Sequence, residues 1–254
     1  MYPVLFKFGF ITVYSYGALL AIGFLVSAFL IYRNAGRFNL SGEAMLDLAV
    51  IALIFGILGA RIVFILQNLP HFVKYPLEIL DLSKGGLVWY GGFFGGLAAG
   101  FVYARIKAIS FLNVTDLFMP YIALGQAFGR IGCFLNGCCY GAEVSAGYPF
   151  GVTFPGEEIM RHPTQLYSVL ALIVIFIILR VCQENIRFAG EIVCIYGILY
   201  TLKRFGIELL RADNPRIYLG LTFSQAVSVI FFAASVALFI ILKGRWKKKS
   251  LHSQ

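Results

Sequence analysis

Charge is scarce in this sequence, and acidic charge is the scarcest. Charged residues make up 13% of the 254 residues, with 12 aspartates and glutamates against 21 lysines and arginines, whereas 60% of the residues are hydrophobic. The mean hydropathy is +0.84. A chain this apolar has too few polar residues to cover a water-soluble fold. The composition therefore predicts an integral membrane protein, and the net charge of +9 favours membrane lipid over nucleic acid as its partner.

The N-terminus lacks the pattern of a cleavable signal peptide. It begins MYPVLFKFGF, and the first apolar run continues for a full membrane span. We therefore expect this run to be a retained helix. The sequence shows no soluble second domain, low-complexity tract or fixed-period repeat, so we predict a single polytopic membrane domain over residues 1–254.

Seven apolar segments are long enough to cross a bilayer. A spanning helix needs roughly 20 mainly apolar residues, because the hydrocarbon core is about 30 Å thick and a helix rises about 1.5 Å per residue. The sequence predicts an all-α bundle of about seven transmembrane helices, at residues 16–32, 46–66, 86–105, 117–135, 164–182, 190–210 and 222–242.

Lysines and arginines are distributed unevenly between alternate loops. Eleven lie at 33–37, 105–107, 180–187 and 243–249, whereas six lie at 7, 74–84, 161 and 211–216. Because loops rich in these residues stay in the cytoplasm, we expect the N-terminus outside and the C-terminus inside. Residues 136–163 would then form an extracytoplasmic loop.

Four cations fall within or at the edge of the predicted spans: Arg61, Arg130, Lys203 and Arg204. An arginine at the centre of a spanning helix costs about 2.5–3.5 kcal/mol, so it normally faces a partner, water or a polar substrate. One such cation is explained by a structural ion pair or by snorkelling to the interface. Four together, which the predicted topology places mainly in the outer half of the membrane, favour a site for a polar substrate.

The sixth predicted span carries charges of both signs. Arg204, Glu208 and Arg211 are spaced i, i+4 and i+7, which predicts that they share one helix face. Because Glu208 neutralises only one guanidinium, the face keeps a net positive charge. Arginine binds phosphate in bidentate fashion, so this pattern favours a phosphate-bearing ligand.

The five cysteines and three histidines do not form a known metal-binding pattern. Cys133, Cys138 and Cys139 cluster after the fourth span but match no CxxC motif, and no histidine has a companion spacing. We therefore predict no metal site and no cofactor. The spacing is compatible with a disulfide from Cys133 to either neighbour or with free thiols.

Five motifs occur in an order that we can compare with known families. They are GARIVF (59–64), GGLVWYGG (85–92), GRIGCFLNGCCYG (129–141), RHPTQLY (161–167) and RFGIELLR (204–211). With these motifs and seven predicted spans, nearly the whole chain resembles the bacterial prolipoprotein diacylglyceryl transferase family of the inner membrane. The resemblance implies transfer of diacylglycerol from phosphatidylglycerol to the lipobox cysteine of a prolipoprotein signal peptide, with release of glycerol phosphate.

The resemblance also implies roles for individual residues. Arg130 and Arg204 would stabilise the phosphate and leaving group, as suits charge development in a site of low dielectric constant, and Glu208 would orient Arg204. Tyr16 and Tyr90 would complete the catalytic group. The residues expected to bind substrate are Arg61, Asn136, Gly141, His162, Gln165, Tyr167 and Arg211.

Three positions depart from the family's usual pattern. Tyr90 stands where the family commonly has histidine, and Cys133 and Cys138 replace an asparagine and a glutamate of the signature. A tyrosine with a pKa near its reference value of about 10 is a weak base at neutral pH, so His162 is an alternative proton acceptor or a helix-cap residue. The alternative functions are a divergent paralogue with another acceptor, a membrane thiol oxidoreductase, and a non-catalytic lipid-binding or transport protein.

Overall fold

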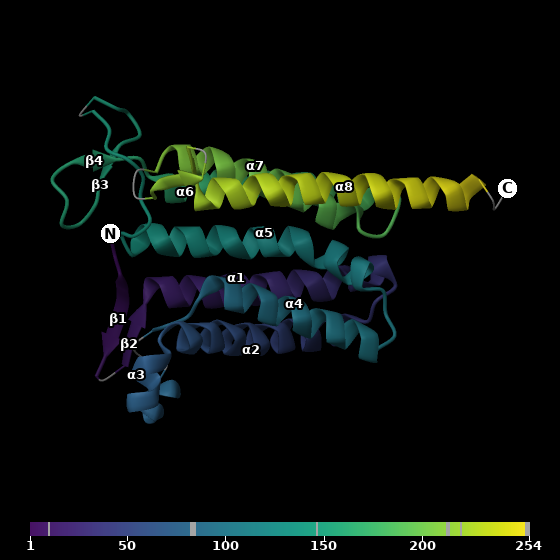
Figure 1. Cartoon of the computed structure of the whole chain (residues 1–254), viewed down its shortest axis with the longest axis horizontal. Helices are drawn as coiled ribbons and strands as arrows, with labels where there is room; N and C mark the ends of the chain where they lie inside the picture. The colour runs from purple at the N-terminus through teal and green to yellow at the C-terminus, as the bar shows by residue number, and fades with distance from the viewer. Residues whose placement is uncertain (10, 82–84, 146, 212–213, 219, 252–254) are drawn as a thin grey trace. The chain divides into compact units, whose positions relative to one another are not determined.

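Seven long helices dominate the computed structural model, which describes residues 1–9, 11–81, 85–145, 147–211, 214–218 and 220–251 (Figure 1). Each of them coincides largely with one of the predicted apolar segments, which confirms the helical character of those segments. The helices are α1 (Ser15–Asn34), α2 (Gly42–Gln67), α4 (Trp89–Ile106), α5 (Phe111–Leu135), α6 (Thr164–Glu184), α7 (Glu191–Leu209) and α8 (Phe223–Leu251).

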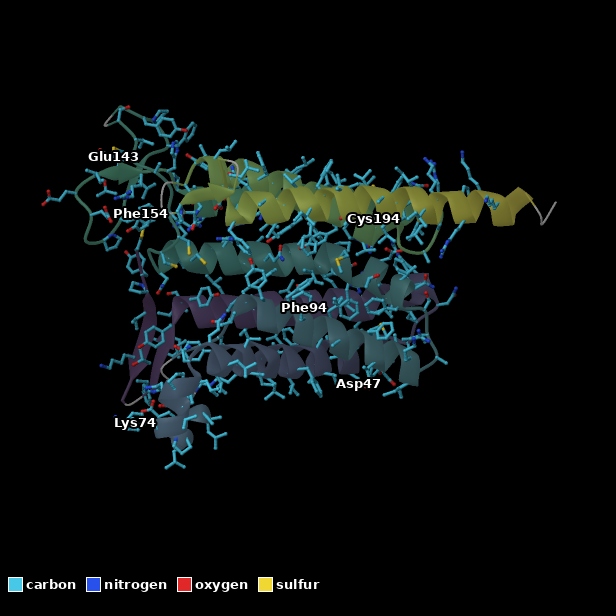
Figure 2. The ribbon with its side chains drawn as sticks, in the orientation of Figure 1. Asp47, Lys74, Phe94, Glu143, Phe154 and Cys194 are labelled. Carbon is cyan, nitrogen blue, oxygen red and sulfur yellow. The ribbon has the colours of Figure 1, made fainter. Side chains whose placement is uncertain are left out.

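Four of these helical segments are long and apolar enough to cross a membrane. Their bounds as spans are Ser15–Phe38, Gly42–Gln67, Thr164–Glu184 and Phe223–Lys248. At most a third of each of these apolar segments is buried within the protein, and lipid is the solvent that suits such a surface. Among the residues labelled in Figure 2, Phe94 lies within a helix, whereas Lys74 and Glu143 lie outside the long helices. The chain is an integral membrane protein.

The chain forms two compact units, which we describe separately. One comprises Met1–Leu30 with Thr115–Gln254, and the other comprises Ile31–Val114. In the second unit, α2 packs closely along α4. A Cβ atom on Gly59, Gly91 or Gly95 would overlap backbone atoms of the facing helix, so only glycine permits this approach.

In the first unit, small residues also bring α1 against α5. A Cβ on Gly23 would stand 2.7 Å from the Cβ of Phe128. The hydroxyl of Ser27 donates a hydrogen bond of 2.9 Å to the carbonyl of Tyr121. These contacts hold α1 against α5, and both helices carry candidate site residues.

A buried polar network joins α5, α6 and α7. Pro120 lies inside α5 and has no N–H, which leaves the carbonyl of Asp116 without its helical donor. The amide of Gln183 donates 2.6 Å to that carbonyl. The Asp116 carboxylate accepts backbone N–H bonds from Gly190 (2.6 Å) and Val193 (3.0 Å) at the start of α7. The proline and the buried carboxylate therefore fix the position of α7.

The predicted all-α class omits several short elements. The structure adds helix α3 (Leu69–Lys74), 3-10 turns at Ala35–Phe38 and Pro76–Ile79, and three two-stranded hairpins. A run of two to five residues carries too little periodic pattern to predict. Lys84, one of the cations used to orient the chain, lies outside the described residues. The hairpins pair β1 (Val4–Phe8) with β2 (Ile11–Tyr14), β3 (Val152–Thr153) with β4 (Met160–Arg161), and β5 (Arg216–Tyr218) with β6 (Leu221–Thr222).

Candidate active site

The C-terminal end of α5 closes with a glycine-dependent turn. Gly137 has φ of 71°. Its N–H bonds to the carbonyl of Phe134, and the N–H of Cys138 bonds to the carbonyl of Cys133, both at 3.1 Å. This pair of bonds is a Schellman motif, in which the residue after the glycine packs against the residue three positions before the cap. Those two positions are Cys138 and Cys133, so the turn itself brings two thiols together.

The third thiol joins them because Cys139 also adopts a left-handed conformation, with φ of 65°. The Sγ atoms of Cys133, Cys138 and Cys139 lie within 4.8 Å of one another. All three are free thiols. Of the two alternatives left by the spacing, the structure has the free thiols, and it brings all three sulfurs of the sequence cluster close together.

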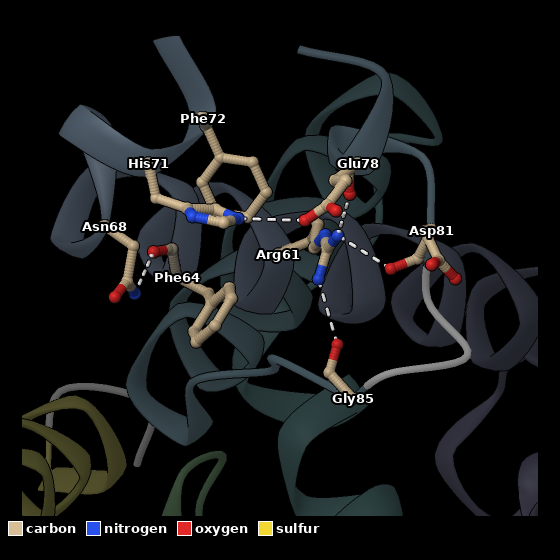
Figure 3. A pocket seen from close by; sticks show the side chains of 8 residues that line it. All are labelled: Arg61, Phe64, Asn68, His71, Phe72, Glu78, Asp81 and Gly85. Atoms are coloured by element: carbon tan, nitrogen blue, oxygen red, sulfur yellow. Dashed lines mark hydrogen bonds and ion pairs between the residues drawn. The ribbon is translucent and has the colours of Figure 1, made fainter. Parts of the chain in front are cut away.

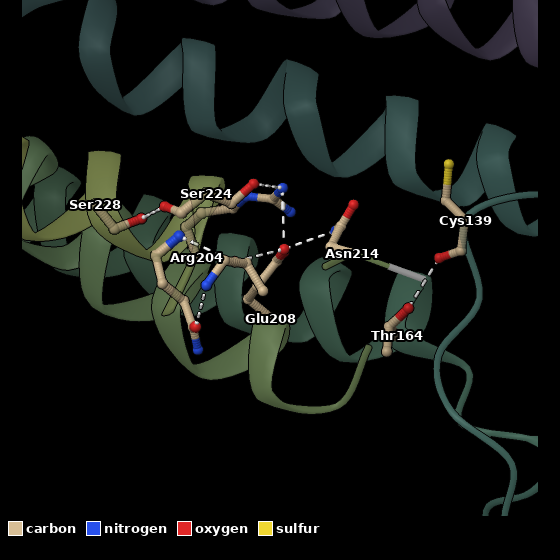
Figure 4. A network of polar contacts seen from close by, with 9 residues as sticks. Cys139, Thr164, Arg204, Glu208, Asn214, Ser224 and Ser228 are labelled. Atoms are coloured by element: carbon tan, nitrogen blue, oxygen red, sulfur yellow. Dashed lines mark hydrogen bonds and ion pairs between the residues drawn. The ribbon is translucent and has the colours of Figure 1, made fainter. Parts of the chain in front are cut away.

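Two buried side chains of α6 hold this turn. The hydroxyl of Thr164 donates 2.9 Å to the carbonyl of Cys139 (Figure 4), and the amide of Gln165 donates 2.7 Å to the carbonyl of Cys138. Thr164 is 2% exposed and Gln165 is 0% exposed. Gln165 was predicted to bind substrate, and that role stays a prediction; the observed bond positions the thiol turn.

Gly141 lies where no side chain fits. A Cβ there would stand 2.6 Å from the carbonyl oxygen of Leu210, 2.7 Å from Thr164 and 2.8 Å from His162. Its N–H donates 2.8 Å to the carbonyl of His162. Gly141 therefore joins the signature loop to the segment before α6 and to the end of α7, which explains its place in the motif.

Arg130 lies one turn before the end of α5 and is half-buried. No hydrogen bond or ion pair joins its guanidinium to any residue that the structure describes. The positive charge of Arg130 lies close enough to repel that of Lys203, and the charge of Arg204 does the same. Three cations therefore concentrate on one region of the first unit, and at least one of them has all its donors available for an anion.

The predicted pair between Arg204 and Glu208 is confirmed. The two side chains meet at 3.2 Å, and that of Glu208 is 0% exposed. Arg204 also donates 2.7 Å to the hydroxyl of Ser224 on α8. The other Glu208 oxygen accepts from Asn214 at 2.6 Å (Figure 4) and from Thr222 at 3.0 Å. One ion pair and two hydrogen bonds thus hold the buried carboxylate, and the bonds of Arg204 to Glu208 and Ser224 fix the direction of the arginine fork.

The predicted face of three charges is wrong at its last member. Helix α7 ends at Leu209 and the N–H of Arg211 bonds to the carbonyl of Glu208, so the last turn tightens and Arg211 follows the helix. The positive charge of Arg211 nevertheless lies close enough to Cys139 to stabilise its thiolate form. Arg211 thus contributes to the same polar region from the loop rather than from the helix face.

The thiol turn is an electropositive environment. The pKa of the Cys139 thiol is lowered to about 5, because hydrogen bonds with the thiols of Cys133 and Cys138 and the charges of Arg130 and Arg211 stabilise its thiolate. Positive charge therefore reaches this turn both from α5 and from the segment that follows α7.

Tyr16 and Asn136 lie beside this turn. A Cβ on Gly132 would stand 3.0 Å from the ring of Tyr16, which places the tyrosine against the last turns of α5. Tyr16 is 41% exposed, and the charge of Arg130 acts on it. Asn136 is exposed at the turn and hydrogen-bonds the thiol of Cys138. Their predicted roles in catalysis and substrate binding stay predictions.

His162 and Tyr167 form an aromatic group next to Gly141. Nδ1 of His162 lies 3.4 Å from the Tyr167 hydroxyl, and its ring meets that of Tyr148 edge-on at 5.0 Å. Pro163 occupies the N-cap of α6. His162 thus precedes the cap, and its alternative role as the helix cap is not what the structure shows.

Arg61 and Tyr90 belong to the other unit. Arg61 is 8% exposed and borders a cavity of about 190 Å³ with His71, Glu78 and Asp81 (Figure 3). Its three nitrogens donate to five backbone carbonyls, those of Glu78, Ile79, Asp81, Gly85 and Gly86, at 2.6–3.3 Å.

Tyr90 lies in the first turn of α4 and is 44% exposed. Its ring meets that of Trp89 edge-on at 5.3 Å. The proposed catalytic role of Tyr90 and the proposed substrate-binding role of Arg61 stay predictions. Because all five N–H donors of Arg61 are used, its observed bonds favour a structural role.

Comparisons with known proteins identify the family of this chain. The model of the prolipoprotein diacylglyceryl transferase family matches residues 3–241. A phosphatidylglycerol–prolipoprotein diacylglyceryl transferase of Clostridium tetani is 31% identical and covers 98% of this chain and 100% of its own. The transferase of Finegoldia magna is 36% identical, covering 94% and 93%, and that of Geobacillus kaustophilus is 34% identical, covering 96% and 94%. The chain therefore belongs to the prolipoprotein diacylglyceryl transferase family.

Proposed function

We propose that this protein transfers the diacylglyceryl group of phosphatidylglycerol to the lipobox cysteine of a prolipoprotein signal peptide. The observation that carries this proposal is the half-buried Arg130, which has no acceptor among the described residues and lies in electrostatic reach of Lys203. A cation without a partner in an apolar bundle is costly unless an anion binds there. The phosphodiester of phosphatidylglycerol supplies that anion within the same bilayer.

Arg130 and Arg204 have different roles in the proposed reaction. Arg130 binds the phosphate directly through its available fork. Arg204 shares its fork between Glu208 and Ser224, so it is held in one orientation toward the leaving group. When the bond between the glyceryl carbon and the phosphate oxygen breaks, glycerol phosphate gains a negative charge. Cations fixed in advance stabilise that charge without reorganising.

The neighbouring residues contribute to binding. Tyr16 and Asn136 line the thiol turn, Gly141 gives the loop its close approach, and Arg211 adds positive charge. The residues His162, Gln165 and Tyr167 would shape the acceptor side. Tyr90 and Arg61 belong to the other unit, and for them the catalytic and substrate-binding roles rest on the motif matches alone.

We also propose the finer topology. All seven long helices cross the bacterial inner membrane, with the N-terminus outside, the C-terminal lysines inside and residues 136–163 outside. The lysine and arginine distribution supports this orientation. Labelling of single reporter cysteines in a cysteine-free background tests it, and a reporter at residue 147 that reacts only from the cytoplasmic side contradicts it.

The reaction is tested by incubating the purified protein with phosphatidylglycerol and a lipobox peptide. Mass spectrometry should detect the peptide with one added diacylglyceryl group. Phosphatidylethanolamine replaces the donor in one control, and a peptide with serine in place of cysteine replaces the acceptor in the other. An unmodified cysteine peptide, from protein that is folded and in the presence of phosphatidylglycerol, contradicts the proposal.

A further inference from the structure

The thiol turn after α5 has the composition of a metal centre. Three Sγ atoms, from Cys133, Cys138 and Cys139, lie within 4.8 Å of one another. Tetrahedral zinc with Zn–S bonds of about 2.3 Å holds its sulfur ligands about 3.8 Å apart. Small side-chain rotations therefore bring all three sulfurs to one ion. Thiolate sulfur is a soft ligand that selects ions such as Zn²⁺ over Mg²⁺ or Ca²⁺.

The backbone around the thiols is built to keep them together. The Schellman turn places Cys133 against Cys138, and the Cys139 conformation adds the third sulfur. The fully buried Thr164 and Gln165 fix the carbonyls of the last two cysteines. Partners of this kind, which orient the ligands without touching the ion, support metal sites generally.

The thiol cluster is accessible from one side, and nearby arginines offset the negative charge that it would have with zinc bound. Cys139 is exposed, so a fourth ligand has access. Three protein ligands with one open position is the arrangement of catalytic zinc, whereas structural zinc has four protein ligands. Three thiolates and Zn²⁺ leave one net negative charge. The nearby charges of Arg130 and Arg211 offset it.

We propose that Cys133, Cys138 and Cys139 bind Zn²⁺, whose fourth position receives the acceptor thiol of the prolipoprotein. This inference rests on the transferase function proposed above. The reaction requires a thiolate nucleophile, but a free cysteine thiol titrates near pH 8.5 and is mostly protonated at neutral pH. A thiol bound to zinc is deprotonated by the ion. The site thereby supplies the nucleophile that the transfer requires.

The step balances without an oxidant. The acceptor thiol loses its proton to water as its sulfur binds Zn²⁺. That sulfur then attacks the glyceryl carbon bonded to the phosphate oxygen, forming a C–S bond while the C–O bond breaks. The electron pair leaves with glycerol phosphate, whose new charge faces Arg130 and Arg204. The thioether product is neutral and binds zinc weakly, so it is released and the ion stays.

Metal binding is tested first, on the full-length protein purified in detergent with thiols reduced. Elemental analysis should find about one zinc per chain. Cys133→Ser, Cys138→Ser and Cys139→Ser should each lower zinc affinity by roughly tenfold or more. Cys182→Ser, a cysteine in α6 outside the cluster, is the matched control and should retain zinc. Equal zinc in the control and in all three variants, or no bound zinc in the parent, overturns the proposal.

The role of the open position is tested with Co²⁺ in place of zinc, which needs no variant. A thiolate-to-cobalt absorption band should appear in the parent and change when a lipobox cysteine peptide is added, but not with the serine peptide. An unchanged spectrum overturns acceptor binding. Copper(I) retained instead of zinc, or a disulfide within the cluster as the stable state of the active protein, also overturns the proposal.

Transfer measured on metal-free and zinc-restored protein separates this inference from the proposed function. Removal of zinc should lower transfer at least roughly tenfold, and added zinc should restore it. Full transfer by metal-free protein overturns the zinc inference while the transferase function stands. Bound zinc and a peptide-dependent cobalt spectrum without any mass increment contradict the transferase function and leave the zinc site established.

Discussion

Arg61 and Arg130 are both arginines of long apolar helices, yet their surroundings are opposite. Arg61 is 8% exposed and donates all five of its N–H groups to backbone carbonyls. Arg130 is half-buried and bonds to none of the residues that the structure describes. In the sequence both are merely cations inside an apolar segment. The hydrogen bonds distinguish the two: Arg61 fixes a neighbouring loop, whereas the guanidinium of Arg130 is available to a ligand.

The difference follows from what each helix meets. Backbone carbonyls of residues 78, 79, 81, 85 and 86 lie around Arg61 at the end of α2, so its own N–H groups are all used and none is left for a phosphate. The end of α5 instead meets thiols, a tyrosine and further cations, none of which is a carboxylate. The Glu208 carboxylate is already paired with Arg204. Of the two arginines, Arg130 is therefore the one whose guanidinium donors remain available to a phosphate.

The largest effect is expected when Arg61 is replaced by methionine. Five carbonyls lose their donor, and each buried acceptor left unpaired costs about 1–3 kcal/mol. We expect the free energy of unfolding to fall by at least about 3 kcal/mol, measured by denaturation in detergent. Arg105→Met is the control, because Arg105 is exposed at the end of α4. Similar stability of the two variants would contradict a structural role for Arg61.

Arg130→Lys tests the other side of the comparison. Lysine keeps the charge but loses the bidentate fork. Turnover should fall by roughly tenfold or more, equivalent to about 1.4 kcal/mol of transition-state stabilisation, while stability changes little. Arg161→Lys is the control, since Arg161 pairs with Glu157 on a hairpin and was not assigned to the site. Loss of stability without loss of turnover would place Arg130 in the same class as Arg61.

Arg204→Lys should have a similar or somewhat smaller effect on turnover. A lysine at this position can still pair with Glu208 but cannot also direct a second pair of donors. We expect roughly a tenfold loss, with the protein still inserted and folded. The measurement is turnover together with phosphatidylglycerol affinity. Near-normal turnover in both lysine variants would mean that these arginines only pair structurally, and the phosphate site would be abandoned.

Sequence patterns predicted the helices well because each is a long apolar run. They also predicted the Arg204–Glu208 pair, which depends only on helix periodicity. They failed where the chain leaves a helix. The exit after Leu209 displaced Arg211, and the turn at Gly137 gathered thiols that share no familiar spacing. One signal was present: a glycine at a helix end brings together the residues four before and one after it, and both are cysteines.

Contacts between segments that are distant along the chain could not be predicted from the sequence. Nothing local to Arg61 indicates that the carbonyls of residues 78–81 and 85–86 accept its hydrogen bonds, and nothing near Cys138 indicates the bond from Gln165. The same holds for Asn214 and Thr222, which complete the partners of Glu208. These partners come from tertiary packing, which single-sequence periodicity does not encode.

The smallest effect is expected for Glu208→Gln, which alters how Arg204 is held while leaving both arginines in place. The glutamine oxygen can keep the bonds from Asn214 and Thr222, but the charge that orients the guanidinium is lost. We expect turnover to fall by a few fold, because the fork is less well aligned with the leaving group. The site also gains one net positive charge, so phosphatidylglycerol affinity should be equal or higher. A fall in turnover with unchanged or tighter donor binding identifies Glu208 as a positioning residue. Weaker donor binding with unchanged turnover would instead show that the carboxylate shapes the donor pocket, and the assigned orientation of Arg204 would be wrong.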